Sequence, residues 1–158
     1  MKDSAHLKIP VPILIADDDL DDCQMIKEAL YESRLLNSLH FVEDGEELMN
    51  YLCHKGKFED RLKFPTPGLI LLDLNMPKKD GREALREIKS NADLRQIPII
   101  VFTTSQAEED VLRTYDLGVN SFITKPVKFE DLVRMMRDLG HYWFEIVKLP
   151  EPPNLKPR

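Results

Sequence analysis

Cysteine is scarce in this sequence, and its two copies, Cys23 and Cys53, form neither a CxxC pair nor another metal-ligand spacing. Two thiols arranged in this way predict a reduced protein without a disulfide framework. Basic residues are also too few, because 22 Lys and Arg stand against 28 Asp and Glu and leave a net charge of −6. A nucleic-acid surface needs a clustered excess of Lys and Arg. We therefore expect no nucleic-acid partner.

Long apolar runs are missing as well. No stretch approaches the roughly 20 residues that cross a bilayer. The opening residues MKDSAHLKIPVP lack the apolar core of a secretory signal. These absences predict a cytoplasmic protein with no membrane partner. At 42% hydrophobic, the 158 residues can bury one core and suit a single domain.

Short apolar runs recur along the chain, and several are continuous rather than alternating, as in parallel strands that are covered on both faces. We expect strands at Ile13–Ala16, Leu39–Val42, Leu69–Leu72, Ile97–Phe102 and Ser121–Thr124. Segments of helical periodicity separate or follow them at 20–36, 46–54, 82–90, 106–117 and 128–147. This alternation predicts an α/β fold, a doubly wound five-stranded parallel sheet with five helices. The long loop His54–Gly68 is expected to be an exposed connector.

Polar side chains follow the predicted strands at the edge where such sheets bind their ligands. Asp17 and Asp18 come after the first strand, Asp73 after the third, Thr103 at the end of the fourth and Lys125 after the fifth. Clustered carboxylates repel one another unless a cation neutralises them, and oxygen ligands suit Mg²⁺. A carboxylate can attack phosphorus, while a metal and a lysine balance the phosphoryl charge. The pattern predicts aspartyl-phosphate chemistry.

Four motifs, ILIADDD, LILLDLNMPKKDG, IIVFTTS and ITKP, stand in this order and resemble the receiver domains of two-component response regulators over about residues 11–140. The resemblance implies a flavodoxin-like strand order 2-1-3-4-5, a receiver domain at 11–147 and terminal extensions at 1–10 and 148–158. It also implies Mg²⁺ as cofactor and a sensor histidine kinase as phosphoryl donor. Such a protein is not an enzyme toward other molecules, although it assists its own phosphorylation and dephosphorylation. The expected output is a switch in partner binding, with no effector domain in this chain.

The resemblance also assigns the acidic residues. Asp73 is the phosphoacceptor, and Asp17 and Asp18 form the acidic pair. Asp18 is the expected direct metal ligand, whereas Asp17 acts largely through a water. Asn75 gives its backbone carbonyl to the metal.

Three further positions have roles in the switch of this family. Thr103 is the switch hydroxyl, and Phe122 occupies the aromatic switch position, where tyrosine is common. Phenylalanine has no hydroxyl group, so Phe122 cannot form the hydrogen bond that a tyrosine hydroxyl forms. A switching step that depends on that bond is not expected in this protein. Lys125 is the family lysine, and its bond to Pro126 is expected to be a cis peptide, since proline lowers the cost of that isomer.

The end of the last predicted helix concentrates aromatic residues in Tyr142, Trp143 and Phe144. One interpretation is an ordinary packed helix end, and the other is an apolar contact patch for a second chain. The long loop, the TTS triplet and the ending YWFEIVKLP resemble the small response regulators paired with cyanobacterial phytochromes, which form homodimers through this side of the domain. The resemblance implies a phytochrome-like kinase partner and a homodimer.

Two other functions remain open from the sequence alone. An aspartate-based phosphatase or phosphotransferase of the haloacid dehalogenase type also uses a strand-end Asp and Mg²⁺, although its DxDx[TV] motif follows the first strand, where this chain has DDDLD. A receiver-like scaffold that is not regulated by phosphorylation is the second. Asp19, Asp21 and Asp22 are expected to be solvated residues at a helix start rather than ligands.

Overall fold

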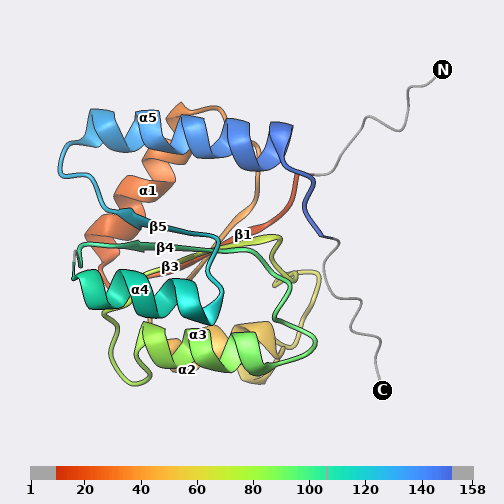
Figure 1. Ribbon diagram of the computed structural model, residues 1–158. Helices are drawn as coiled ribbons and strands as arrows, with labels where there is room; N and C mark the ends of the chain where they lie inside the picture. Colours follow the sequence, from red (N-terminus) through yellow and green to blue (C-terminus); the bar gives the residue numbers. More distant parts are fainter. Residues whose placement is uncertain (1–9, 106, 151–158) are drawn as a thin grey trace.

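The computed structural model describes residues 10–105 and 107–150, and it has a central parallel sheet between two layers of helices (Figure 1). The strands are β1 (Ile13–Ala16), β2 (Leu39–Val42), β3 (Leu69–Leu72), β4 (Ile99–Thr103) and β5 (Ser121–Thr124). They pair in the order β2-β1-β3-β4-β5, and every pairing is parallel. The predicted doubly wound α/β fold is therefore confirmed, with its strand order.

Helices cover both faces of the sheet, with α1 and α5 on one face and α2, α3 and α4 on the other (Figure 1). Their bounds are α1 (Leu20–Glu32), α2 (Gly45–Leu52), α3 (Gly81–Ser90), α4 (Glu108–Leu117) and α5 (Phe129–Gly140). Successive strand residues point to opposite faces, so β1 sends Ile13 and Ile15 into the core under α1 and α5, and Leu14 and Ala16 into the other core. No helix among the described residues is long and apolar enough to cross a membrane.

Short polar residues set where the helices begin. Asp19 precedes α1 and accepts hydrogen bonds from the backbone N–H groups of Asp21 and Asp22, and Asp80 caps α3 in a similar way. Helix α4 ends at Gly118, whose φ of 101° is left-handed and favours glycine. The caps at Asp19 and Asp80 fix the loops that lead from the ends of β1 and β3 into α1 and α3.

The loop His54–Gly68 is only in part the exposed connector that its prolines and glycine predict, because residues 55–57 and 59–63 are exposed whereas others are buried. It forms a short 3₁₀ helix, η2 (Gly56–Phe58), and Phe58 is buried. The Phe58 and Phe64 rings pack edge to face at 5.0 Å, and both contact Tyr51 of α2. Proline and glycine indicate turns, but they do not indicate whether neighbouring aromatic residues find a hydrophobic surface to cover.

The last helix also differs from the prediction of one helix over 128–147. Helix α5 ends at Gly140, and residues His141–Ile146 form a π-helical segment, η3, which the backbone N–H of Val147 closes on the carbonyl of Tyr142. A Cβ at Gly140 would lie 2.5 Å from Cδ2 of Leu35, so this end of α5 packs closely against the segment after α1. The terminal extensions 1–10 and 148–158 lie mostly outside the described residues.

The three aromatic residues predicted as a dimer patch do not share one environment. Trp143 is only 8% exposed and belongs to the core under α1 and α5, and Phe144 packs partly against the same core. Tyr142 is 52% exposed and Ile146 61%. The interpretation as an ordinary packed helix end therefore holds for Trp143, which is not free to serve in a contact patch, whereas Tyr142 is exposed.

Candidate functional site

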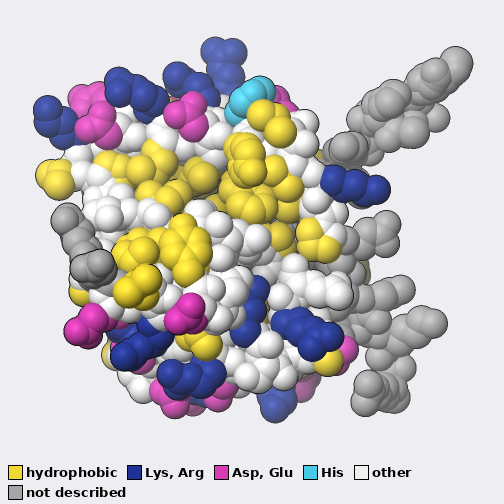
Figure 2. Space-filling view, in the orientation of Figure 1, with side chains coloured by type: hydrophobic (Ala, Val, Ile, Leu, Met, Phe, Trp, Pro, Cys, Tyr) yellow, Lys and Arg dark blue, Asp and Glu magenta, His cyan; other side chains and the backbone are white. Residues whose placement is uncertain are grey.

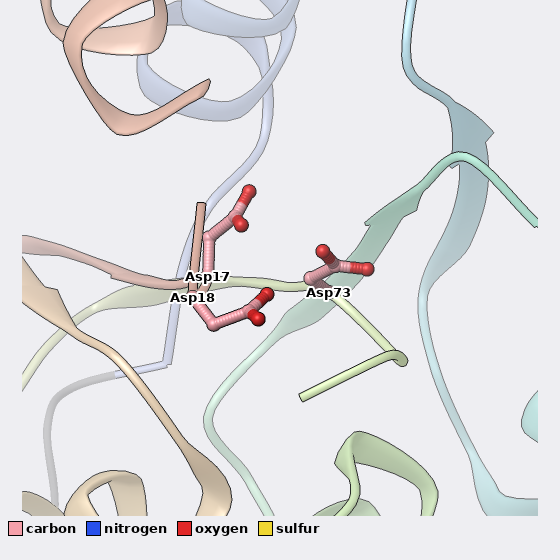
Figure 3. Close-up of side chains that lie close together, drawn as sticks. All are labelled: Asp17, Asp18 and Asp73. Atoms are coloured by element: carbon pink, nitrogen blue, oxygen red, sulfur yellow. The ribbon is translucent and has the colours of Figure 1, made fainter. Parts of the chain in front are cut away.

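Three carboxylates meet at the carboxyl ends of β1 and β3 (Figure 3). Asp17, Asp18 and Asp73 each offer a carboxylate oxygen, and these oxygens lie within 4.8 Å of one another. They meet because β1 and β3 pair in register, so that the residues after Ala16 and Leu72 are neighbours. Asp17 and Asp73 are buried, whereas Asp18 is exposed. Two buried carboxylates and one open to solvent form a donor set that suits a hard divalent cation.

A single ammonium group balances part of this charge. Nζ of Lys125 lies 2.6 Å from Oδ2 of Asp17, 2.8 Å from Oδ2 of Asp22 and 3.1 Å from Oδ2 of Asp73. Burial by itself lowers the pKa of Lys125, but its hydrogen bonds to Asp17 and Asp22 outweigh burial and raise that pKa. Burial raises the pKa of Asp17 to about 6, although its hydrogen bond with Lys125 opposes the shift. Lys125 is therefore a cation at neutral pH.

Thr103 and Asn75 complete the surroundings of Asp73. The buried Thr103 hydroxyl donates to Oδ1 of Asp73 at 2.8 Å, and the Asn75 backbone N–H donates to the same oxygen at 3.3 Å. The Lys125 backbone N–H donates to the carbonyl of Thr103 at 2.8 Å, which ties the ends of β4 and β5 together. The structure thus brings Asp17, Asp18, Asp73, Thr103 and Lys125 to one place, as their strand-end positions predict. The metal-binding role of the Asn75 carbonyl stays a prediction.

Sequence reasoning missed Asp22. We expected a solvated residue at a helix start, but its carboxylate forms an ion pair with the buried Lys125 ammonium. The spacing in the sequence does not mark this contact, because Asp18 precedes the N-cap Asp19 and lies outside α1.

The bond between Lys125 and Pro126 is trans rather than the expected cis, since no peptide bond among the described residues is cis. Trans is the intrinsically favoured isomer of an X–Pro bond by about 0.5–1 kcal/mol. In this isomer the Lys125 side chain already reaches the three carboxylates. The geometry of the site therefore does not depend on a cis bond.

A second charged network holds the loop after β4. The Arg82 guanidinium of α3 donates twice to the Asp110 carboxylate of α4, at 2.7 and 2.6 Å, and the Ser105 hydroxyl donates to Asp110 at 2.8 Å. Ser105 lies two residues after Thr103. Phe122 on β5 is partly buried and packs against the core on this side of the sheet. The switch positions therefore lie beside a loop that is anchored to two helices.

The Arg82–Asp110 pair predicts a pH effect on stability. The hydrogen bonds from Arg82 lower the pKa of Asp110 from 3.8 to about 2. Because the folded-state pKa lies below the unfolded value, the stabilisation is present above about pH 4 and is lost as the pH falls toward 2. It is at most about 2 kcal/mol in the free energy of unfolding. Urea unfolding gives the free energy of unfolding of the wild type and of Asp110→Asn at each pH. The difference between the two isolates Asp110, because the other carboxylates titrate in both proteins and cancel. The gap between the two should shrink as the pH falls from 5 to 2.5, and a constant gap would contradict the assignment.

Known proteins resemble this chain over most of its length. The family model described as response regulator receiver domain matches residues 13–137. Response regulator Rcp1 of Synechocystis sp. is 43% identical over 141 residues, which cover 89% of this chain and 94% of Rcp1. The crystal structure of the Mn²⁺-bound form of Rcp1 has a TM-score of 0.81 at 43% identity, over 89% of this chain and 99% of that one. The phosphorylated cyanobacterial phytochrome response regulator RcpA has a TM-score of 0.83 at 39% identity, over 90% and 99% of the two chains.

Proposed function

The chain belongs to the response regulator receiver domain family, and from this premise we propose that it accepts a phosphoryl group on Asp73 from a sensor histidine kinase. One observation carries the proposal. The buried Asp73 carboxylate lies between a hydroxyl donor, Thr103, and an ammonium donor, Lys125, at an edge where two further carboxylates can hold a cation. The phosphorylated state would change the contacts of Thr103 and Phe122 and so switch the binding of a partner.

The chemistry requires little from the protein beyond position and charge. An Asp73 oxygen attacks phosphorus and forms a new P–O bond, while the P–N bond of the kinase phosphohistidine breaks and its electron pair returns to the imidazole. Lys125 would donate to a phosphoryl oxygen, and the Thr103 hydroxyl would turn from Asp73 to another. Mg²⁺ bound by Asp17, Asp18, Asp73 and the Asn75 backbone carbonyl would neutralise the charge on the transferring group.

The choice of Mg²⁺ is part of the proposal. A divalent metal site is suggested by the acidic cluster and by the Mn²⁺-bound form of Rcp1. Carboxylate oxygens suit both ions, and Mg²⁺ takes one or two carboxylates while it keeps several waters. Two buried carboxylates beside a buried lysine leave a net negative charge that such an ion offsets.

We further propose that the protein is a switch rather than an enzyme toward other molecules, and that it works in the cytoplasm. Asp73 follows β3 rather than β1, unlike the acceptor of the haloacid dehalogenase type. Incubation of the protein with acetyl phosphate and Mg²⁺ distinguishes a phosphorylated switch from a phosphatase and from an unregulated scaffold. A switch gives stoichiometric labelling, a phosphatase gives continuous turnover, and an unregulated scaffold gives neither.

A phytochrome-like kinase is the proposed donor. The support is the likeness to RcpA, which is described as a cyanobacterial phytochrome response regulator, over 90% of this chain. Purified kinases of several sensory classes, each phosphorylated beforehand on its histidine, can be offered to the protein in short incubations. The fastest transfer should come from a phytochrome-type kinase, and equal transfer from all classes would contradict this pairing.

We also propose a homodimer through the face formed by β5 and α5. Figure 2 shows hydrophobic side chains gathered along this face. They line a groove of about 740 Å³ that includes Ile123, Met135, Leu139 and Tyr142. Its charged residues are Asp131, Arg134 and Asp138, which carry both signs and can pair across a twofold axis.

Tyr142→Glu is expected to weaken this dimer. A charge placed in an apolar contact is costly to bury, and the dissociation constant should rise at least about tenfold. Trp143 is avoided because it belongs to the monomer's own core. The matched control is Tyr31→Glu, since Tyr31 is 84% exposed on α1 and is not among the residues that line the groove. Sedimentation over a range of concentrations measures both variants. A monomeric wild type, or equal weakening by the two variants, would rule out this interface.

A further inference from the structure

We propose that Asp22 is a positioning residue for Lys125 in phosphoryl transfer to Asp73, an inference that rests on the proposed function. Asp22 lies on α1, whereas the other two partners of Lys125, Asp17 and Asp73, come from strand ends. Its Oδ2 is 2.8 Å from the ammonium nitrogen, closer than Oδ2 of Asp73 at 3.1 Å. The lysine side chain is 9% exposed and that of Asp22 33%, so the contact joins a buried cation to the rim of the site.

Among the residues that the structure describes, the Asp22 carboxylate serves neither the helix cap nor the acidic cluster. The N-cap of α1 is Asp19, which accepts the backbone N–H groups of Asp21 and Asp22, and the Asp22 carboxylate is not part of this cap. Among the described residues, the acidic group able to hold a metal is Asp17, Asp18 and Asp73, without Asp22. Its recorded side-chain partner is Lys125.

The ion pair of Asp22 with Lys125 can position the lysine because an ammonium group has three N–H donors. In the structure the three donors of Lys125 meet three carboxylates. During transfer the donor that faces Asp73 must pass to a phosphoryl oxygen. With Asp17 and Asp22 as two fixed anchors, the nitrogen can hold its place while this third hydrogen bond changes partner.

Without the charge of Asp22, the ammonium would be shared by Asp17 and Asp73 alone. It would then be drawn toward Asp73 and would neutralise the carboxylate that has to attack phosphorus. Both effects raise the barrier of the chemical step, because a misplaced charged group stabilises the developing phosphoryl charge less well. The binding of the phosphodonor itself changes little, since Asp22 contacts Lys125 rather than the incoming group.

The test compares Asp22→Asn with Asp21→Asn and Asp22→Glu. Asp21 is exposed in the same turn of α1, so Asp21→Asn removes the same charge without a contact to Lys125. Phosphorylation by acetyl phosphate is followed at saturating Mg²⁺ over a range of donor concentrations. Asp22→Asn should lower the maximal rate about tenfold, because a displacement of about 1 Å in a catalytic group can cost up to about a hundredfold. The half-saturating donor concentration should stay within about twofold of wild type, which marks a loss confined to the chemical step.

Asp21→Asn should behave as wild type, and Asp22→Glu should recover most of the rate because it restores a carboxylate on the same helix face. Thermal melting verifies that each variant is folded. An Asp22→Asn rate equal to or above that of Asp21→Asn would overturn the positioning role, and so would a Glu variant as slow as the Asn variant. Wild type that takes no phosphoryl group would instead contradict the proposed function itself.

Discussion

Asparagine in place of Asp73 should abolish phosphorylation by acetyl phosphate or by a kinase. The amide is not a nucleophile toward phosphorus, so the loss should reach the background of the assay rather than a fraction of the wild-type rate. The fold should survive, because the amide oxygen can still accept from Thr103 and Lys125 keeps Asp17 and Asp22 as partners. Intact-mass spectrometry measures the label, and thermal melting measures the fold.

The control for this variant is Asp93→Asn, at an exposed carboxylate in the turn after α3. It should be labelled as fully as wild type, which shows that the loss belongs to one carboxylate and not to a change in overall charge. Persistent stoichiometric labelling of Asp73→Asn would refute the assignment of the phosphoacceptor.

Loss of the Asp18 carboxylate should have the largest effect on metal binding among the single changes that leave the acceptor intact. Asp18 is the exposed member of the acidic cluster and the one with solvent access for an incoming ion. Asp18→Asn removes a charged ligand, so the Mg²⁺ dissociation constant should rise about a hundredfold, at the upper end of what changes around metal ligands cause. Calorimetric titration with Mg²⁺ alone measures the affinity.

Asp19→Asn is the matched control for the metal experiment. Asp19 lies next in the chain and caps α1, and asparagine caps a helix about as well as aspartate. This variant therefore loses the same charge while it keeps the helix start. Equal weakening by the two variants would show that the ion responds to the general negative potential and that Asp18 is not a ligand.

The strand-end site could be predicted because one rule of topology covers it. Parallel strands end at the same edge, so Asp17, Asp73 and Thr103 had to meet once their strands were placed. The register of β1 with β3 and of β3 with β4 bears this out. Five short apolar runs with intervening helices were enough for that, although the start of β4 lies two residues later than predicted.

The contacts of Asp22 and Trp143 could not be predicted from strand topology, because each depends on packing between elements that are far apart in the sequence. Asp22 pairs with a lysine 103 residues away, and an acidic residue in the first turn of a helix looks the same in sequence whether it is solvated or paired. Trp143 lies in the π-helical segment after α5 and is buried in the chain's own core. Aromatic residues at a helix end indicate burial, but the sequence does not say whether the same chain or a second one covers them.

The central claim is that this chain carries its phosphoryl group on Asp73. The most direct measurement incubates the wild-type protein with acetyl phosphate and Mg²⁺, determines the intact mass, and maps the modified residue by reducing the acyl phosphate before peptide sequencing. The predicted result is one added phosphoryl group per chain, dependent on Mg²⁺ and located at Asp73. No added mass, or a label on any residue other than Asp73, would contradict it.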